Sequence, residues 1–410
     1  MGMILQGPEW FETIQVPNAA GVQTPQELLP QKELRKNKFI WGIKAVAKFH
    51  VRVVGAAGNA SVFNKEFPLG FIDRLKVDGS SKKFGGVREF QNVSAPTLVQ
   101  FLNGFTFRPL SAFVAINGGK FIQMIGPTAG TGIDGSTNNA LPAGPTAGAS
   151  TTDYDCIVAY MIPFVPLGVP IEQQALFMLK GPDWEVLNVH FYVADQSGLF
   201  DVKANTTITF GAIEGGAING GSSAPAGNPT ISIHLMRPNL GTARDSSALG
   251  RLLLHRTFQP LTSTIQAANL TDGLIARLSV TMKYLRMWAK TGVKPTDTPS
   301  NGVGAVIQGL TDGIITRPKL KKAGVLIRNP IATFEAKEWY SFAHGTPTPA
   351  GYILYDFCES GDVNTYFPAD QIKTKDDFTF EGDVTAAANQ IGEILEERIL
   401  EAPGTASVLK

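Results

Sequence analysis

The residues of this chain that could do chemistry are few and far apart in the sequence. Its five histidines are scattered, and no His-Glu-x-x-His or Cys-x-x-Cys pattern brings zinc ligands together. No Gly-x-Ser-x-Gly elbow offers a nucleophilic serine. Gly118-Gly119-Lys120-Phe121 lacks the remainder of a phosphate-binding loop. The sequence therefore predicts no catalytic, cofactor or metal site, and no enzyme activity.

The polar residues that come nearest to a site lie on predicted strands. Asp153 and Asp155 flank Tyr154 at a strand start, and their spacing of two places both carboxylates on one face. A metal could use such a pair, but carboxylates at a strand edge are usually solvated, and that is the prediction here. His50 and His234 alternate with apolar residues, so both imidazoles are predicted to face solvent.

A short basic run is the densest positive charge in the chain. It could contact nucleic acid or lipid headgroups, or it could form a solvated or intersubunit salt-bridge face. A formal net charge of +1 argues against a dedicated nucleic-acid binder, which needs a clear basic excess. The residues of the run are Arg317, Lys319, Lys321 and Lys322.

The N-terminal segment, residues 1–38, is predicted to be an arm. It is rich in Pro, Gln and Asn, and Trp10-Phe11 is an apolar anchor within it. It is either a disordered terminus with a charged junction or a docking arm that packs on a neighbour or a membrane face. The residues expected to make such a contact are Trp10, Phe11, Lys32, Arg35, Lys36 and Lys38.

Composition limits the class of protein. Apolar residues make up 43% of the 410 residues and charged residues only 17%, which suits a surface that is hidden against neighbours. With 43 glycines and 26 prolines, many short strands are expected. Two cysteines exclude a disulfide scaffold, and no secretory signal opens the chain. The longest uncharged apolar run, 156–171, holds three prolines and is too short to span a bilayer. A soluble protein made in a reducing cytosol is expected.

Period-two patterns predict a mainly antiparallel β-protein. The clearest strands are 43–53 and 274–284, each with one apolar face. Helices are expected only at 94–102 and at 386–400, where Ile391, Ile394, Leu395 and Ile399 have helical spacing. Further strands are predicted at 184–193, 206–210, 231–235 and 352–357.

Low-complexity segments and a broken strand suggest the domain limits. Residues 126–152 and 211–228 are rich in small residues and are predicted to be loops. A junction is expected between Arg237 and Arg251. The predicted divisions are an arm at 1–38, a first β-domain at 39–240 that includes the loop 126–152, a second at 250–400, and a tail at 401–410.

Three short landmarks of the first half recur in order in the second half. The segment Leu69–Leu75 resembles Asp272–Leu278, and Phe191–Gly198 resembles Leu354–Gly361. A strand ending in Thr-Phe follows each time, at 208–210 and at 378–380. A third Asp-Gly copy at 310–317 is interpreted as a local echo, because Gly273 opens the better-patterned strand. The order predicts two copies of one β-domain.

These motifs resemble those of the double jelly-roll major capsid proteins of tailless icosahedral viruses and phages, the adenovirus-like lineage. The resemblance covers roughly residues 39–400. It implies an all-β fold of two tandem eight-stranded antiparallel jelly rolls with long loops and few short helices. The second domain departs from a clean duplication, because it is shorter between the landmarks.

The resemblance also implies a function. It implies a structural protein of the virion whose homotrimers, pseudo-hexagonal in outline, tile an icosahedral shell. Penton and minor capsid proteins, and an internal lipid membrane beneath the arm, are implied partners; no sequence-specific nucleic acid and no cofactor is expected. Synthesis in a host cytoplasm and residence in the capsid follow. The alternative is a receptor- or carbohydrate-binding β-sandwich of the spike or lectin type, although residues 126–152 hold no exposed aromatic platform.

Overall fold

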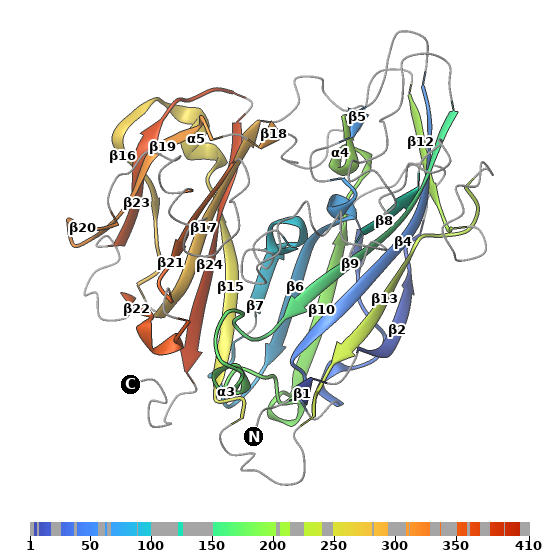
Figure 1. The fold of residues 1–410 in the computed structure, drawn as a ribbon, viewed down its shortest axis with the longest axis horizontal. Helices are drawn as coiled ribbons and strands as arrows, with labels where there is room; N and C mark the ends of the chain where they lie inside the picture. The colour runs from blue at the N-terminus through green and yellow to red at the C-terminus, as the bar shows by residue number, and fades with distance from the viewer. Residues whose placement is uncertain are drawn as a thin grey trace.

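Two β-sandwiches stand side by side, the first blue to green and the second yellow to red (Figure 1). No helix in the part of the chain that is described is long and apolar enough to cross a membrane. The computed structural model describes residues 4–5, 8–17, 26–36, 39–55, 62–63, 67–87, 89–99, 122–125, 151–201, 206–213, 225–239, 249–280, 283–293, 309–310, 312–328, 337, 351–358, 361–369, 378–388 and 390–401.

The first sandwich is built from eight principal strands. When these strands are numbered in chain order, the strands of one sheet lie side by side in the order first, eighth, third, sixth. Those of the other sheet lie in the order second, seventh, fourth, fifth. The strands are β2 (Glu9–Gln15), β3 (Gln26–Leu28), β4 (Gly42–Val54), β6 (Ile72–Ser80), β7 (Glu89–Ser94), β9 (Thr151–Pro163), β10 (Val186–Val193) and β13 (Thr230–Met236).

The second sandwich repeats this order strand for strand. Its sheets again pair as first-eighth-third-sixth and second-seventh-fourth-fifth. Eight strands in two such Greek-key sheets form a jelly roll, so the chain holds two of them in tandem. The strands are β15 (Leu252–Pro260), β16 (Leu270–Arg277), β17 (Lys283–Val293), β19 (Ile315–Lys322), β20 (Val325–Arg328), β21 (Tyr352–Asp356), β23 (Phe378–Val384) and β24 (Gln390–Glu401).

Short elements decorate both jelly rolls. The first carries β1 (Ile4–Leu5), β5 (Val62–Phe63), β8 (Ile122–Ile125), β11 (Phe200–Asp201), β12 (Thr207–Gly211), β14 (Pro238–Asn239), η1 (Leu34–Lys36), η2 (Leu69–Phe71), η3 (Gly181–Asp183), α3 (Ile171–Ala175), α4 (Gln196–Leu199) and a helical turn at 95–99. The second carries β18 (Gly309–Leu310), β22 (Phe367–Pro368), α5 (Thr262–Ala267) and η5 (Val363–Thr365).

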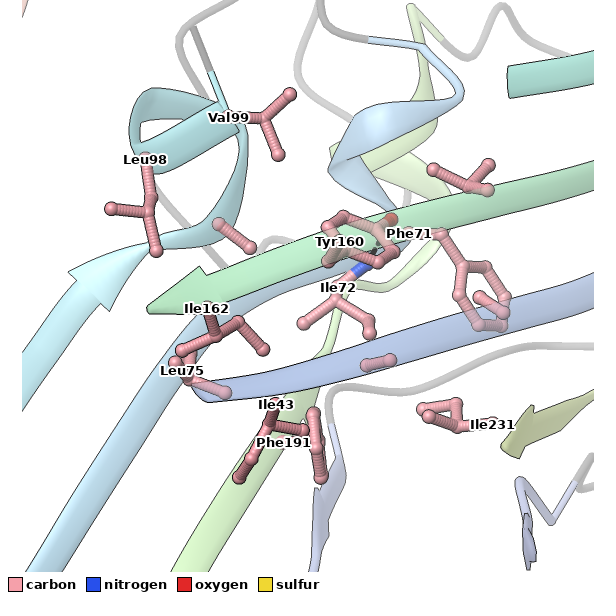
Figure 2. Packing of buried hydrophobic residues seen from close by; sticks show 14 of the residues in the cluster. Ile43, Phe71, Ile72, Leu75, Leu98, Val99, Tyr160, Ile162, Phe191 and Ile231 are labelled. Carbon is pink, nitrogen blue, oxygen red and sulfur yellow. Dashed lines mark hydrogen bonds between the residues drawn. The ribbon is translucent and has the colours of Figure 1, made fainter. Parts of the chain in front are cut away.

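Alternating apolar residues hold the first sandwich together. Along β4 every second side chain, including Phe49, is removed from solvent between the sheets. The Phe49 and Phe71 rings stack with centroids 4.1 Å apart. Tyr160 from β9 reaches across the core, where its hydroxyl donates to the Leu69 carbonyl at 2.8 Å and accepts the Ile72 amide at 3.2 Å (Figure 2). The buried hydroxyl therefore ties β9 to the start of β6.

The predicted arm is wrong where the structure describes it. β2 pairs with β13 from Glu9 to Gln15, and β3 pairs with β10. These strands hold the first and second positions of the first jelly roll, so this domain begins at Glu9 and not at residue 39. The segment lacks a strong period-two pattern because β2 and β3 are short edge strands, each paired on one side only among the described residues.

Two further predictions about elements are wrong. The helix expected at 386–400 is the strand β24, which packs apolar residues on both faces and pairs with β15 and β17. The single strand expected at 274–284 is divided between β16 and β17. The other strands at 43–53, 184–193, 206–210, 231–235 and 352–357, and a helix within 94–102, are confirmed.

The internal duplication is real, but the predicted counterparts do not match. The segment Leu69–Leu75 leads into β6, the fourth strand, whereas Asp272–Leu278 lies in β16, the second strand. The copy at 310–317, dismissed as an echo, leads into β19, which is the fourth strand of its domain. Gly313 is thus the counterpart of Gly70. The other two landmark pairs also fall on non-equivalent strands, namely β10 with β21, and β12 with β23.

The proposed limits of domains and loops are only partly within the described chain. Residues 126–150 of the predicted long loop lie outside it, as do 214–224, 240–248 and 402–410. Thr151 and Thr152 already belong to β9. The ends of the second domain and the C-terminal tail stay predictions.

Replacing Phe49 by Ala should lower the free energy of unfolding by about 3–5 kcal/mol, because it leaves a cavity beneath the stacked Phe71 ring. Val54→Ala is the matched control: Val54 ends the same strand, is 38% exposed, and should change stability by less than about 0.5 kcal/mol. Urea unfolding followed by tryptophan fluorescence measures both. Equal losses for the two variants would contradict this account of the core.

Candidate assembly surfaces

The two jelly rolls share one continuous sheet. β7, at the edge of a sheet of the first jelly roll, lies parallel to β15, at the edge of a sheet of the second. The strands meet at Gln91 and Arg256, and the Gln91 side chain donates to the Leu254 carbonyl at 3.0 Å. The junction therefore joins unlike strands, the fifth of one domain and the first of the next.

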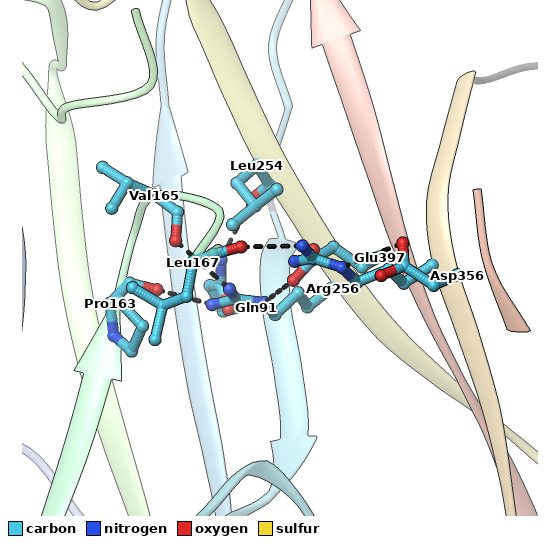
Figure 3. A network of polar contacts seen from close by, with 9 residues as sticks. Gln91, Pro163, Val165, Leu167, Leu254, Arg256, Asp356 and Glu397 are labelled. Atoms are coloured by element: carbon cyan, nitrogen blue, oxygen red, sulfur yellow. Dashed lines mark hydrogen bonds and ion pairs between the residues drawn. The ribbon is translucent and has the colours of Figure 1, made fainter. Parts of the chain in front are cut away.

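Four charged side chains lie behind this junction (Figure 3). Glu397 of β24 accepts from Arg256 of β15 at 2.7 Å and from Arg286 of β17 at 2.9 Å. Arg286 also lies 3.3 Å from Asp356 of β21. Arg256 and Glu397 are completely buried, and Arg286 is nearly so. Two positive and two negative charges balance one another.

The remaining arginine donors reach into the first jelly roll. Arg256 donates to the carbonyls of Pro163 at 2.5 Å and Val165 at 3.3 Å, and Arg286 donates to that of Leu167 at 2.7 Å (Figure 3). Pro163 is the last residue of β9, and Val165 and Leu167 lie in the segment that follows it. The second jelly roll thus supplies the donors that let the first bury this segment.

Burial and charge act against each other on these arginines. Burial lowers the pKa of Arg256 more than Glu397 raises it. At Arg286 burial also lowers the pKa, but Asp356 and Glu397 together outweigh it and raise the value above its usual range. Removing one carboxylate would leave a buried positive charge without its partner, which is far costlier than replacing the whole group by apolar residues.

A second buried polar cluster lies at the same junction between the two jelly rolls. Arg398 donates to His255 Nδ1 at 2.9 Å and pairs with Glu396 at 2.9 Å. The other side of the His255 ring hydrogen-bonds the backbone of Glu89, which belongs to β7 of the first jelly roll. Burial, and then the charge of Arg398, lower the pKa of His255 to about 3, so its imidazole is neutral in the native protein.

Three of the N-terminal candidates come together on the outer edge of the first jelly roll. Lys32 Nζ lies 4.5 Å from the centroid of the Trp10 ring and donates to the Phe11 carbonyl at 2.7 Å. The Glu12 carboxylate accepts the backbone amides of Gln31 and Lys32, each at 3.0 Å. Trp10 is nevertheless 57% exposed. An aromatic ring with a cation over it is thus presented at the free edge of β2.

The other basic candidates lie apart from this ring. Arg35 pairs with Glu33 at 2.5 Å and donates to the Glu185 carbonyl at 2.7 Å. Lys36 is 3.9 Å from the same Glu33 carboxylate. Lys38 lies outside the described residues. Arg35 and Lys36 therefore have local partners, and only Trp10, Phe11 and Lys32 form one contiguous group.

The prediction of a solvent-facing His50 is wrong, and so is that of solvated carboxylates. His50 is 5% exposed and lies 2.7 Å from Asp155 and 3.1 Å from Asp153. Arg52 closes the group by binding Asp153 at 2.7 Å. Burial alone would lower the pKa of His50, but the two carboxylates outweigh it and raise the value. The described residues contain no cluster of three or more His, Cys, Asp or Glu arranged to hold a metal.

Acidic side chains of the second jelly roll form ion pairs with residues of the basic run. Lys319 lies 2.8 Å from Asp272, and Lys321 lies 2.7 Å from Glu381. Arg317 is 3.4 Å from Asp383 and stays 49% exposed. These pairs cross neighbouring strands, so most of the positive charge is neutralised within the sheet.

Sequence reasoning missed the buried charges at the junction. A signal was present, because each one interrupts an apolar run: Arg256 follows Leu252-Leu253-Leu254-His255, and Arg286 lies within Tyr284–Trp288. Glu396-Glu397-Arg398 stands between two apolar pairs. Charges inside apolar stretches predict buried ion pairs, although the partners cannot be assigned from spacing alone.

Solved structures resemble the whole chain. The major capsid protein of Sulfolobus Turreted Icosahedral Virus aligns with a TM-score of 0.54 over 97% of this chain and 98% of its own, at 11% identity. A second structure from that virus gives 0.55 over 97% and 91%, also at 11% identity. The chain therefore shares its double jelly-roll fold with this capsid protein. The Faustovirus major capsid protein aligns at 0.50 over 95% and 90%, at 10% identity.

Neither of the sequence comparisons finds a relative of this double jelly roll. No protein-family description matches the chain, and no curated protein sequence matches it. At these identities the likeness in structure concerns the fold, and the function has to be argued from the surfaces.

The substitution Glu397→Gln should lower the free energy of unfolding by about 3–5 kcal/mol, because Arg256 and Arg286 lose their shared charge partner in a buried site. Glu401→Gln on the same strand is the control. Glu401 is partly exposed beside Lys283, so its loss should stay below about 1 kcal/mol. Chemical denaturation provides the comparison. A Glu397→Gln variant as stable as wild type would show that the network does not hold the junction.

The stability of the double jelly roll should fall below pH 6.5 because of His255. The pKa of His255 is about 3 in the folded protein and 6.5 in the unfolded chain. Between pH 6.5 and pH 3 the unfolded chain therefore binds a proton on His255 that the folded protein does not bind, and unfolding becomes easier as the pH falls. His255→Gln should flatten the loss of stability between these pH values, as measured by urea titrations in a pH series.

His50→Gln provides a control of opposite sign. The pKa of His50 is raised, so its contribution is complete below pH 6.5 and disappears as the pH rises through the folded value. The penalty of His50→Gln should therefore shrink on going to alkaline pH. If both variants showed the same pH dependence, the assigned charge states would be wrong.

Proposed function

We propose that this chain is a structural major capsid protein whose homotrimers, pseudo-hexagonal in outline, tile an icosahedral virion shell. The observation that carries the proposal is the repeated strand order of two jelly rolls, which are joined by the β7–β15 contact and by hydrogen bonds from buried Arg256 and Arg286. The likeness in fold to viral capsid proteins over nearly the whole chain supports it. Such a chain suits a building block, because buried Arg256 and Arg286 help to hold its two domains together.

Symmetry explains why two jelly rolls suit such a block. Three chains place six similar sandwiches in a ring, so a trimer has a nearly hexagonal outline and can have neighbours on six sides. Closed shells made from few kinds of contact need subunits of this type. A rigid junction within the chain keeps the angle between the two sandwiches constant from copy to copy.

The proposed partners follow from this role. They are other copies of the chain, penton and minor capsid proteins, and an internal lipid membrane. The contact residues at the N-terminal end are Trp10, Phe11, Lys32, Arg35, Lys36 and Lys38, and the exposed Trp10 ring at a free strand edge supports a contact with a neighbour. The protein would be made in a host cytoplasm and reside in the capsid.

A receptor- or carbohydrate-binding sandwich is the competing function. The solved structures from Sulfolobus Turreted Icosahedral Virus and Faustovirus give it no support, since they are of a virus or of major capsid proteins. No described feature of either jelly roll favours sugar binding over self-association.

The native mass of the purified protein tests the proposal. We expect a stable trimer of about three times 43.9 kDa by light scattering or native mass spectrometry, and closed particles by electron microscopy at higher concentration. A chain that stays monomeric over the whole concentration range and binds glycans on an array would overturn the capsid assignment and favour the competing function.

A further inference from the structure

The junction between the two jelly rolls is a head-to-tail contact. It uses the free edge of the fifth strand of one domain, β7, and the free edge of the first strand of the next, β15. Arg74, on the fourth strand beside β7, lies with its guanidinium carbon 3.6 Å from the centroid of the Phe258 ring on β15. Arg74 also approaches Glu393 of β24 at 3.8 Å. The contact between β7 and β15 therefore includes an arginine stacked over an aromatic ring.

Each jelly roll has a first strand and a fifth strand, but the internal junction uses only one strand of each kind. The fifth strand of the second jelly roll is β20, and the first strand of the first jelly roll is β2. Each is the last strand of its sheet in the described chain, paired on one side only. They lie at opposite ends of the molecule, β20 beyond β19 and β2 beyond β13 (Figure 1). Heterologous halves at opposite ends are the geometry from which rings of identical copies are built.

The two unused edges carry exposed apolar side chains. Val325 and Leu326 on β20 are 68% and 38% exposed, and Trp10 on β2 is 57% exposed. Soluble proteins usually protect free strand edges with charge, proline or a covering segment. In contrast, Gln91 and Arg256, which occupy the used edges at the internal junction, are fully buried.

The arginine of the internal junction also has a counterpart. Gly313-x-Ile315-x-Arg317 repeats the spacing Gly70-x-Ile72-x-Arg74 at the start of the fourth strand. Arg74 lies against an aromatic ring of the adjoining domain, whereas Arg317 is 49% exposed and lies near Asp272 and Asp383 of its own domain. Trp10 is the exposed aromatic ring on β2 that could take the place of Phe258.

We propose that β20 of one copy docks against β2 of a second copy, repeating between chains the contact that β7 and β15 make within the chain. This inference rests on the proposed function and assigns the strands through which the trimer closes. Val325 and Leu326 pack beside the Trp10 of the neighbour, and Arg317 lies over the same ring. Three such contacts alternate with three internal junctions, so all six sandwiches have similar surroundings.

Charged substitutions at the two edges test the assignment. Val325→Glu and Trp10→Glu should each raise the concentration at which trimers dissociate by about tenfold or more, because each buries a carboxylate in an apolar contact. Leu274→Glu is the matched control. Leu274 is 41% exposed on β16, at the opposite edge of the sheet that contains β20, and its variant should keep the trimer. Sedimentation velocity measures the dissociation of the trimer for these three variants and for the wild type.

Cross-linking separates loss of contact from loss of folding. The variant that combines Val325→Cys with Trp10→Cys should give covalent dimers and trimers, and no larger species, with a short bis-maleimide. Each single variant should stay uncross-linked, because the native Cys156 and Cys358 are buried.

The outcomes distinguish the two proposals. Trimers that survive both glutamate substitutions and do not cross-link would overturn the strand assignment while leaving the capsid function intact. A wild-type chain that never associates would overturn both.

Discussion

The structure depends on four charged side chains that are almost completely removed from water. Glu397 lies between Arg256 and Arg286, and Asp356 balances the second arginine. Desolvating such groups costs several kcal/mol for each ion, so their burial is tolerated only when every donor and acceptor has a partner. The carbonyls of Pro163 and Leu167 in the first jelly roll accept from Arg256 and Arg286 of the second. The two arginines therefore keep these acceptors only in this relative placement of the two domains.

A fixed placement turns a duplicated domain into a directional subunit. Two jelly rolls on a flexible linker would offer the same edges at many angles, and a closed ring could not form from them. With the β7–β15 contact supported by hydrogen bonds from Gln91, Arg256 and Arg286 across the junction, the outer edges β2 and β20 have a constant relation to each other. Polar interactions contribute specificity here, whereas the apolar cores on either side supply most of the stabilisation.

The sequence predicted the elements whose pattern depends on one buried face. β4, β10 and β13 each alternate apolar and polar residues, and the period-two pattern is clearest in β4. The spacing of apolar residues in β24 predicts a helix because this strand is covered on both sides: ion-paired Glu396, Glu397 and Arg398 stand where apolar residues would continue the alternation. The duplicated fold was predicted through landmarks that turn out to be non-equivalent, since short motifs recur at any strand start. Only the order in which the strands pair identifies Gly313 as the residue of the second jelly roll that is equivalent to Gly70.

Candidate residues were predicted less well, because burial of a polar group depends on partners distant in sequence. Period two correctly placed Asp153 and Asp155 on one face, but nothing local indicates that His50 and Arg52 lie opposite them on β4. The same limit applies at the junction, where Arg256 and Glu397 are neighbours only because β15 pairs with β24. Charged residues are 17% of the chain, and several of them are buried in pairs. The outer surface is therefore poorer in free charge than the composition suggests, which lowers the electrostatic cost of bringing copies together.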